Sequence, residues 1–296
     1  MQGGEPRKIL VTGAAGVVGG YVADVFADDE LTLTDITGGL TRLDVRDPEE
    51  CRTVIGGARP DVVIHLAAAT DVDLCEQDHD FAFATNAMGT QNVALAARDV
   101  GALVVYTSTA GVFGGDKADA PYTEFDEPGP ANVYGVSKLA GERAVETLLE
   151  RFYICRAGWM VGGGPKDRKF VGKLIEIIEG GATTLRAVND KFGTPTYARD
   201  LATGIRSLIP TGHYGLYHLV NGGGSCTRYD VAVALVELLG RDDIAVEPVS
   251  SAFFPLPAPR ARSEAMINYK LELLGLNEQR HWRDALEFYV REELGR

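Results

Sequence analysis

The stretch from Lys8 to Phe26, KILVTGAAGVVGGYVADVF, constrains the fold more than any other part of the chain. It opens with the apolar, partly β-branched run Ile-Leu-Val, which favours a buried strand. Gly13, Gly16 and Gly19 then follow in the spacing Gly-x-x-Gly-x-x-Gly, and a helical pattern of apolar residues continues to Phe26. Strand, glycine turn and helix in this order are typical of a dinucleotide-binding site. An ordinary Gly-rich connection has the same local pattern, so features elsewhere in the chain are needed to distinguish it from a dinucleotide-binding site.

Each glycine has its own expected role. Gly13 allows the tight turn that leaves the strand, Gly16 lets the backbone approach a pyrophosphate, and Gly19 lets the helix pack closely against the strand. The N-terminus of the helix then presents free N–H groups and the positive end of the helix dipole to the phosphates.

The charge balance argues against several classes of partner. The chain has 42 Asp and Glu against 29 Lys and Arg, which disfavours nucleic acid or an anionic membrane as the main partner. We see neither a signal region nor an apolar run long enough to cross a membrane, and we expect a cytoplasmic protein. The four cysteines form no Cys-x-x-Cys pair and the five histidines show no metal spacing. We therefore expect reduced thiols and no metal site.

A second strand is predicted at Leu31–Asp35, and its last residue suits a dinucleotide. Asp35 lies 22 residues beyond Gly13, close to the usual place of the carboxylate that binds the adenosine ribose. A carboxylate there accepts both ribose hydroxyls and repels a 2′-phosphate, which favours NAD over NADP. The alternative is an ordinary aspartate in the turn that ends the strand. A third strand is predicted at Leu43-Asp44-Val45, where Asp44 can accept a hydrogen bond from the adenine amine.

Strands and helices then alternate as far as residue 156. Helices are predicted at 48–55, 80–100 and 132–151, and strands at 62–66, 103–107 and 152–156. This alternation predicts an α/β fold with a doubly wound parallel sheet, the Rossmann arrangement. We expect a dinucleotide-binding domain at 1–160 and a smaller substrate-binding lobe at 161–296, with segments near 190–222 returning to the sheet. Beyond residue 160 we predict helices at 169–179, 200–208, 229–239 and 282–294, a strand at 217–220, and no regular element at 248–259.

The fourth predicted strand ends in small residues. Leu66, Ala67, Ala68 and the residues after them leave room for a flat ring beside the backbone. His65 lies inside the apolar part of this strand, where a core histidine with satisfied hydrogen bonds is expected rather than a catalytic one.

Tyr134 and Lys138 are four residues apart in a predicted helix, so they share one face. A tyrosine has a pKa of about 10, too high for acid–base chemistry at neutral pH, and a nearby cation lowers it. Thr109, at the end of the fifth predicted strand, adds a hydroxyl that can polarise a carbonyl. Taken singly, a Tyr–Lys pair is typical of a solvated helix face and a Ser/Thr cluster of a turn.

The order of these motifs resembles the extended form of the short-chain dehydrogenase/reductase superfamily. The carrying residues are the Thr-Gly-x-x-Gly-x-x-Gly run at 12–19, Asp35, Thr109 and Tyr134-x-x-x-Lys138, which span much of the chain. The resemblance implies that Tyr134 is the acid/base, that Lys138 is its partner and binds the nicotinamide ribose, and that Thr109 orients the carbonyl. It also implies that Asn86 supports the lysine through a water.

Within this superfamily the chain looks most like the dTDP-4-dehydrorhamnose reductase family. The similarity lies in Asp71–Glu76, Asn132–Glu142, Arg156–Trp159, Phe170-Val171, Gly193–Thr196 and Asp200–Ala202. That family reduces the 4-keto group of a deoxy nucleotide sugar by hydride from a nicotinamide. The resemblance implies NAD as cofactor, with NADP as the alternative, and a nucleotide-diphosphate sugar held by the C-terminal lobe. It also implies carbohydrate biosynthesis and a homodimer built on the helices at 80–100 and 132–151.

Three sets of site residues follow from the resemblance. The catalytic set is Thr109, Tyr134 and Lys138. The cofactor set is Gly13, Gly16, Val17, Val18, Gly19, Asp35, Asp44, Val45, Leu66, Ala67, Ala68, Thr107, Tyr134, Lys138 and Ala157. The substrate set is Thr109, Ala110, Tyr134, Trp159, Lys169 and Arg260. Lys169 and Arg260 are candidate diphosphate contacts, and ordinary surface positions are the alternative for both.

Two departures from the family pattern bear on the substrate. Ala110-Gly111 replaces an Asp-Tyr pair that helps to define the sugar pocket, and Arg260-Ala261 replaces Arg-Pro. These changes predict a different sugar with retained catalysis. An epimerase that keeps its NAD bound, and a non-catalytic regulatory subunit, are the alternative functions; a dehydratase is disfavoured because its Thr-Asp-Glu run is absent at 108–110.

Overall fold

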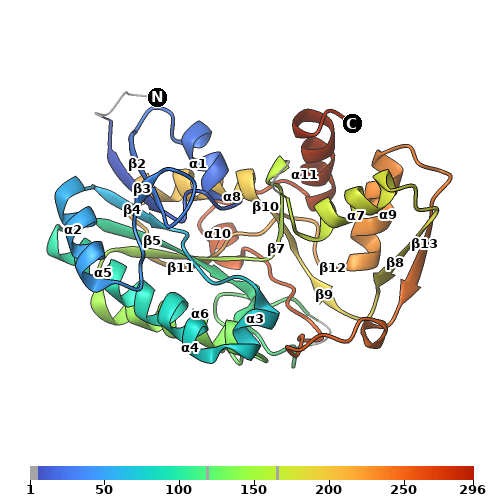
Figure 1. The fold of residues 1–296 in the computed structure, drawn as a ribbon, viewed down its shortest axis with the longest axis horizontal. Coiled ribbons are helices and arrows are strands. Elements are labelled where there is room, and N and C mark those ends of the chain that lie inside the picture. The colour runs from blue at the N-terminus through green and yellow to red at the C-terminus, as the bar shows by residue number, and fades with distance from the viewer. Residues whose placement is uncertain (1–5, 118–119, 165–166) are drawn as a thin grey trace.

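Seven parallel strands, in the order β11-β6-β5-β4-β1-β2-β3, form the central sheet of the computed structural model, which describes residues 6–117, 120–164 and 167–296 (Figure 1). In chain order they are β1 (Lys8–Thr12), β2 (Glu30–Asp35), β3 (Thr41–Arg42), β4 (Val62–His65), β5 (Leu103–Thr109), β6 (Phe152–Ala157) and β11 (Gly215–His218). The predicted Rossmann fold is confirmed. The strand order reverses between β1 and β4, which is where such sheets bind their ligands.

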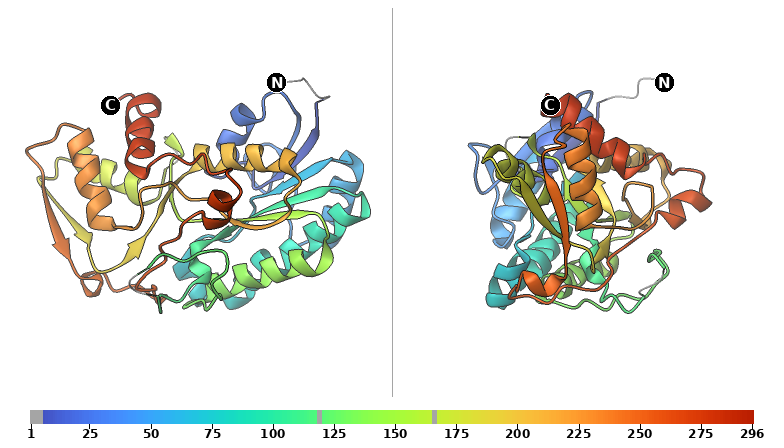
Figure 2. Two further views of the ribbon diagram at one scale, coloured as in Figure 1. Left: turned by 180° about the vertical axis from the view of Figure 1, so that it is seen from behind. Right: turned by 90° about the vertical axis from the view of Figure 1, so that its right-hand side faces the viewer.

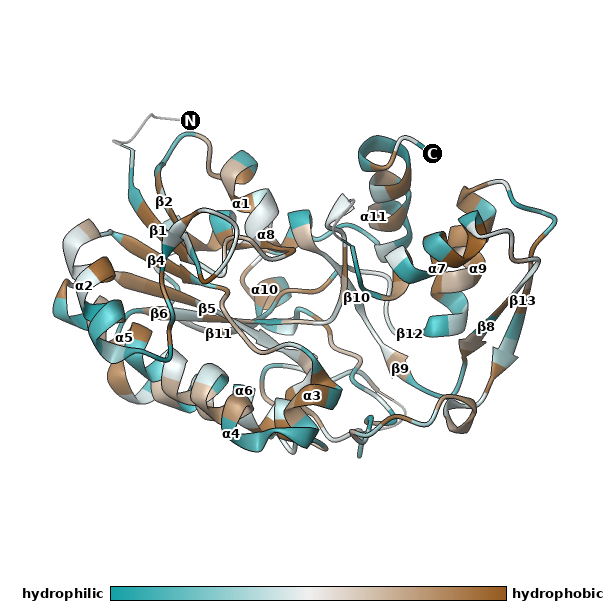
Figure 3. Cartoon of the chain, viewed as in Figure 1, coloured by the Kyte–Doolittle hydropathy of each residue, from teal (hydrophilic) through white to brown (hydrophobic). Residues whose placement is uncertain are grey.

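Helices cover both faces of the sheet (Figures 1 and 2). On one face α1 (Gly19–Val25) packs against α8 (Ala198–Leu208), and on the other α2 (Pro48–Ala58), α5 (Gly89–Asp99) and α6 (Val133–Leu148) pack side by side. Because the inner strands are buried from both sides, they read as continuous apolar runs, and Figure 3 shows apolar residues concentrated there. The predicted helix at 80–100 is α4 (His79–Phe83), a π-helical turn (Ala84–Met88) and α5 in succession.

The third strand lies two residues earlier than predicted. β3 pairs with β2 through Thr41 and Arg42 only, and the chain leaves the sheet at Leu43. Leu43 and Val45 are nevertheless buried, so their apolar pattern reflects packing of a loop over the sheet. The chain must turn away at this point because Asp47 caps α2, accepting hydrogen bonds from the backbone N–H groups of its first turn.

The C-terminal lobe is built from short strand pairs and two helices (Figure 2). β7 (Trp159–Val161) pairs with β10 (Pro195–Tyr197), β9 (Phe192–Gly193) with β12 (Cys226–Thr227), and β8 (Thr184–Val188) with β13 (Ala245–Val249). α7 (Phe170–Glu179) and α9 (Arg228–Leu238) complete it. The prediction of no regular element at 248–259 was wrong in its first half, since Pro248 and Val249 belong to β13 and a 3₁₀ turn follows at Ser251–Phe253. As the edge strand of its pair, β13 tolerates a residue without an N–H group.

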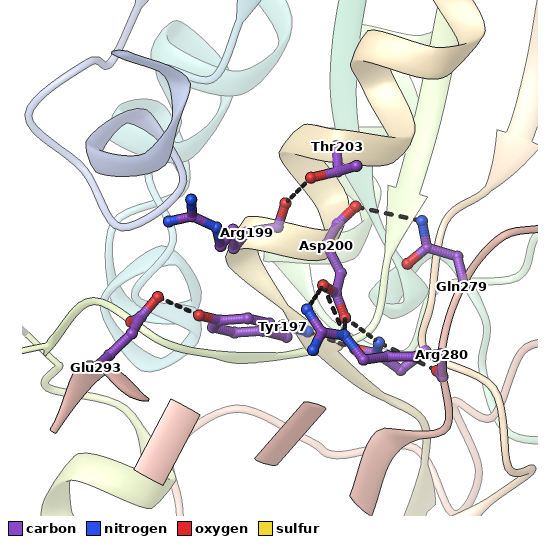
Figure 4. Close-up of polar contacts among 8 residues, drawn as sticks. Tyr197, Arg199, Asp200, Thr203, Gln279, Arg280 and Glu293 are labelled. Carbon is purple, nitrogen blue, oxygen red and sulfur yellow. Dashed lines mark hydrogen bonds and ion pairs between the residues drawn. The ribbon is translucent and has the colours of Figure 1, made fainter. Parts of the chain in front are cut away.

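The last part of the chain returns to the sheet and fastens the two halves together (Figure 4). Arg280 makes an ion pair with Asp200 of α8, with Nε to carboxylate distances of 2.9 and 3.1 Å. After α11 (Trp282–Phe288), Glu293 accepts hydrogen bonds from the hydroxyls of Tyr197 and of Tyr21 in α1. Among the described residues, the other helical elements are α3 (Val72–Gln77), α10 (Tyr269–Leu273), 3₁₀ turns at Ala110–Val112, Ile209–Thr211 and Ser251–Phe253, and a π-helical turn at Tyr289–Glu293.

Candidate active site

A cleft of about 1390 Å³ runs along the carboxyl ends of the central strands and continues into the C-terminal lobe. It is larger than the roughly 300–1,000 Å³ of a site for one drug-sized ligand, so it has room for two ligands together. It is lined by every residue of the three predicted sets except Ala110. Thr109 caps a short 3₁₀ turn at Ala110–Val112, which directs Ala110 into a buried cluster with Phe113 and Tyr122. The prediction that Ala110 lines the substrate pocket was therefore wrong.

The glycine turn at one end of the cleft has no room for side chains. Gly13 has a positive φ of 68°, and a Cβ there would lie 2.6 Å from the backbone nitrogen of Ala67. A Cβ on Gly19 would lie 2.4 Å from the carbonyl oxygen of Ala14, so this glycine allows the close approach of α1 to the turn. Gly16 meets only the carbonyl oxygen of Gly13, and its other side is open to the cleft. The turn forms a backbone cradle that fits a pyrophosphate.

Two carboxylates follow the cradle along the cleft. Asp35 accepts hydrogen bonds from the backbone N–H groups of Ala15 and Thr37, both at 3.0 Å, which fixes it at the end of β2. Asp44 is paired with Arg46 at 2.6 Å, and hydrogen bonding to this guanidinium lowers the pKa of Asp44. Arg46 also lines the cleft, although it was not among the predicted site residues. Its position beside Asp44 follows from the turn before α2.

Tyr134 and Lys138 project into the middle of the cleft from the start of α6. Asn132 caps this helix by accepting a hydrogen bond from the N–H of Gly135 at 2.9 Å. A Cβ on Gly135 would lie 2.1 Å from the carbonyl oxygen of Gly111, so glycine lets the helix start lie directly on the turn that follows Thr109. The fold thus brings Thr109 of β5 beside Tyr134 of α6.

Lys138 is held by its neighbours and not by a carboxylate. Its Nζ donates to the carbonyl oxygen of Thr107 at 2.8 Å and lies 4.1 Å from the centre of the Tyr106 ring. One turn further along α6, Glu142 makes a buried bidentate pair with Arg156, with distances of 2.7 and 2.9 Å. This pair fixes the Lys138 face of α6 against β6.

Burial dominates the protonation of both groups. It raises the pKa of Tyr134 to about 12, and the Thr109 hydroxyl opposes the shift. It lowers the pKa of Lys138 to about 7, and Glu142 opposes that shift. We expected Lys138 to lower the pKa of Tyr134. In the structure burial has the largest effect and raises the pKa, because the tyrosine is enclosed.

Asn86 and His65 have structural partners. The Asn86 side chain bonds both the N–H and the carbonyl of Ala69 (2.8 and 3.0 Å) and donates to the Ser137 hydroxyl at 3.0 Å. It therefore ties the end of β4 to α6, where we had expected support of Lys138 through water. Thr90 donates to the Asn86 carbonyl, so it accepts from Nε2 of His65 at 3.1 Å, and Nδ1 accepts from a threonine hydroxyl of β1. Burial lowers the pKa of His65 to about 3, which agrees with a neutral core histidine.

Arg228 and Glu264 are among the charged residues that line the substrate end of the cleft and were not predicted as site residues. Arg228, the first residue of α9, stacks on the ring of Trp159 at 4.0 Å from its centre. Glu264 accepts a hydrogen bond from Trp159 Nε1 at 3.2 Å. No local motif marks either residue, because they lie in separate segments that meet only in the folded lobe. Of the predicted diphosphate contacts, Arg260 is paired with Asp73 at 3.0 Å, and Lys169 is exposed at the cleft rim.

Comparison with known proteins identifies the family. The family model described as RmlD substrate binding domain matches residues 7–294. A dTDP-4-dehydrorhamnose reductase of Mycobacterium tuberculosis is 37% identical over 96% of this chain and 92% of its own. A reductase of the same name from Clostridium acetobutylicum superposes with a TM-score of 0.90 at 36% identity, covering 96% of this chain and 99% of its own.

The chain belongs to the dTDP-4-dehydrorhamnose reductase family. A dTDP-4-dehydrorhamnose reductase from Bacillus anthracis was solved in complex with NADP. It superposes with a TM-score of 0.90 at 33% identity, covering 97% of this chain and 99% of its own. A UDP-glucose 4-epimerase from Thermus thermophilus shares only the fold, at 24% identity. In the part of the chain that the structure describes, we find no helix long and apolar enough to cross a membrane and no cluster of side chains suited to a metal ion.

Proposed function

We propose that this protein reduces the 4-keto group of a nucleotide-diphosphate deoxysugar with a nicotinamide cofactor. The observation that carries the proposal is the meeting of Thr109, Tyr134 and Lys138 in the middle of one cleft. The glycine cradle lies on one side of them and the C-terminal lobe on the other. A cofactor in the sheet half and a sugar in the lobe half would therefore meet at these three residues.

The cofactor fits the sheet half of the cleft. Gly13 and Gly16 would receive its pyrophosphate, Asp35 the adenosine ribose, and Lys138 the nicotinamide ribose. The hydroxyl of Thr107 is buried without a hydrogen-bond partner among the described residues, as expected of a group that waits for a ligand. Asp35 favours NAD, and NADP is the alternative cofactor; Arg46 would have to leave its pair with Asp44 to reach a 2′-phosphate.

The chemistry follows from the positions of the three residues. A reduced nicotinamide bound in the sheet half would supply the hydride that the carbonyl carbon accepts. The Thr109 hydroxyl accepts a hydrogen bond from the N–H of Gly111 at 3.1 Å and donates to the Tyr134 oxygen, so its proton can turn from the tyrosine to the carbonyl oxygen of a bound sugar. Tyr134 keeps its proton at neutral pH and gives it to that oxygen as negative charge develops, so a hydride and a proton together convert C=O to CH–OH. Lys138, with its lowered pKa, can return a proton to the tyrosine.

We assign cofactor binding to residues 1–160 and sugar-nucleotide binding to residues 161–296. Within the second segment, β11 and α8 complete the sheet half. We also infer a cytoplasmic homodimer. Support for the dimer comes from exposed apolar side chains on one outer face, where Phe83, Met88 and Val136 are 36%, 52% and 41% exposed.

The first test is incubation of purified protein with dTDP-4-dehydrorhamnose and either NADH or NADPH. We expect oxidation of the cofactor in step with reduction of the sugar. A cofactor that stays bound through dialysis, and that isomerises the sugar without net oxidation, would instead identify an epimerase. Protein that binds the cofactor but converts no 4-keto sugar nucleotide of a panel would support a regulatory subunit.

A further inference from the structure

The lobe end of the cleft contains a stack that prepares two charged groups for a ligand. A Cβ on Gly193 would lie 2.2 to 2.6 Å from the Trp159 indole, so the glycine allows this ring to lie flat against β9. Arg228 covers the ring at 4.0 Å and also lies 4.9 Å from the Phe170 ring. Because Gly193 and Arg228 both pack closely on the indole, we infer that Trp159 serves to place its neighbours in the cleft.

Arg228 is not engaged by an ion pair in the part of the chain that the structure describes. Among the described residues it makes neither an ion pair nor a side-chain hydrogen bond, although its guanidinium lines the cleft. Stacking between two aromatic rings engages its faces and leaves the N–H groups at its edge available. Burial lowers its pKa, which shows the cost of keeping this cation out of water. An anionic group of the ligand would remove that cost.

The Glu264 carboxylate has a hydrogen-bond partner for only one of its two oxygens among the described residues. One carboxylate oxygen accepts the Trp159 N–H, and the described residues provide no bond to the other oxygen and no ion pair. Its backbone is fixed, because its N–H donates to the carbonyl of Phe192 at 2.8 Å. A rigid carboxylate in a cleft accepts hydrogen bonds and selects ligands with hydroxyl or amino groups.

Glu264 lies close to the catalytic tyrosine as well as to Arg228. Its charge raises the pKa of Tyr134 and that of Arg228, so the carboxylate lies within reach of both. All three side chains line the same cleft.

We propose that Glu264 and Arg228 determine which nucleotide sugar this protein accepts: Glu264 accepts a hydrogen bond from a hydroxyl on the sugar ring near the reacting carbonyl, and Arg228 binds the diphosphate. This inference rests on the proposed function. A 4-keto sugar carries ring hydroxyls between its carbonyl and its diphosphate-bearing carbon, so a carboxylate close to Tyr134 suits a hydroxyl and an unpaired cation in the same cleft suits the diphosphate. The diphosphate contacts expected from the sequence were Lys169 and Arg260. In the structure Arg260 is already paired with Asp73.

Relatives of this chain differ in the sugar that their names give. A relative from Streptomyces antibioticus, 35% identical over 94% of this chain, carries the name probable dTDP-4,6-dihydroxy-2-methyloxan-3-one 4-ketoreductase. Relatives at similar identity therefore have different substrate names. A carboxylate at position 264 predicts a preference for sugars that keep their ring hydroxyls.

The test of Glu264 compares dTDP-4-dehydrorhamnose with its 2-deoxy and 3-deoxy analogues in wild type, Glu264→Ala and Glu264→Gln. We expect wild type to lose about tenfold or more in kcat/KM on at least one analogue, because the carboxylate is then left without its partner. In Glu264→Ala that penalty should shrink to less than about threefold, whereas Glu127→Gln, an exposed carboxylate outside the cleft, should behave as wild type. An equal penalty in wild type and Glu264→Ala would overturn the role of Glu264.

Arg228 is tested by binding, independently of turnover. Calorimetry with dTDP should show at least about tenfold weaker binding to Arg228→Met, with NADPH binding unchanged. Arg262→Met, which removes an exposed guanidinium two residues from Glu264, is the matched control. Equal dTDP affinity in wild type and Arg228→Met would overturn the assignment. Wild type that binds dTDP through Arg228 but reduces no 4-keto sugar would contradict the proposed function and leave the diphosphate site standing.

Discussion

At the scale of single residues, the site is a compromise between burial and charge. Lys138 is enclosed with a backbone carbonyl and an aromatic ring as its partners, and burial lowers its pKa from the ordinary value to about 7. A buried cation of this kind is kept for chemistry and destabilises the fold.

Lys138→Met should therefore remove turnover and stabilise the cofactor-free protein by about 1–2 kcal/mol near pH 7. In the folded protein the lysine resists protonation, so its cost is largest at low pH and disappears as pH rises from about 7 toward about 10.5, the unfolded value. Urea unfolding of both proteins at pH 7 and pH 10 checks this. A variant that is less stable at pH 7, or an advantage that grows with pH, would contradict it.

His65 and His218 predict a loss of stability of the same sign in a more acidic range of pH. Burial lowers the pKa of each to about 3, so the unfolded chain takes up two more protons than the folded one between about pH 6 and pH 4. The free energy of unfolding should fall by about 2.7 kcal/mol for each pH unit in this window. Unfolding measured at half-unit intervals gives the slope. A slope near zero between pH 6 and pH 4 would show that the two histidines are accessible to protons.

At the scale of elements, neighbouring glycines of α1 have opposite expected effects. A Cβ on Gly19 would collide with the backbone of Ala14, so Gly19→Ala should destabilise the protein by about 1–3 kcal/mol. Gly20 is exposed in the same helix and a Cβ there meets nothing within 4 Å, so Gly20→Ala should stabilise by about 0.5–1 kcal/mol. Thermal unfolding of the two variants compares them directly. Similar shifts for both would refute the close packing at the turn.

The elements also show what sequence alone can predict. The glycine turn and the alternating pattern predict the sheet because each depends on local geometry and burial on both faces. The strand expected at Leu43–Val45 was misplaced because a loop packed over the sheet has the same apolar spacing as a strand. The pKa of Tyr134 was wrong in direction because enclosure depends on segments distant in sequence. Arg228 and Glu264 were missed for the same reason.

At the scale of the whole molecule, the outer face near α4 and α6 predicts association. Met88 and Val136 are large exposed apolar residues on this face, so replacing both with Glu should convert a dimer to a monomer. Ile177→Glu, at a 49% exposed position of α7 in the lobe, should leave the dimer intact. Sedimentation velocity at micromolar concentration distinguishes them. A monomeric wild type, or a double variant that remains dimeric, would contradict the assigned face.

The cleft joins the two halves of the molecule at Tyr134, and the central claim is that hydride and proton meet there. The most direct test follows deuterium from the transferable position of the labelled reduced cofactor into the product of dTDP-4-dehydrorhamnose, with Tyr134→Phe beside wild type. We predict one deuterium on carbon 4 of the sugar with wild type, and a rate lower by about 10²–10⁴ with Tyr134→Phe at unchanged cofactor affinity. A product without deuterium at that carbon, or a Tyr134→Phe variant as fast as wild type, would contradict the account.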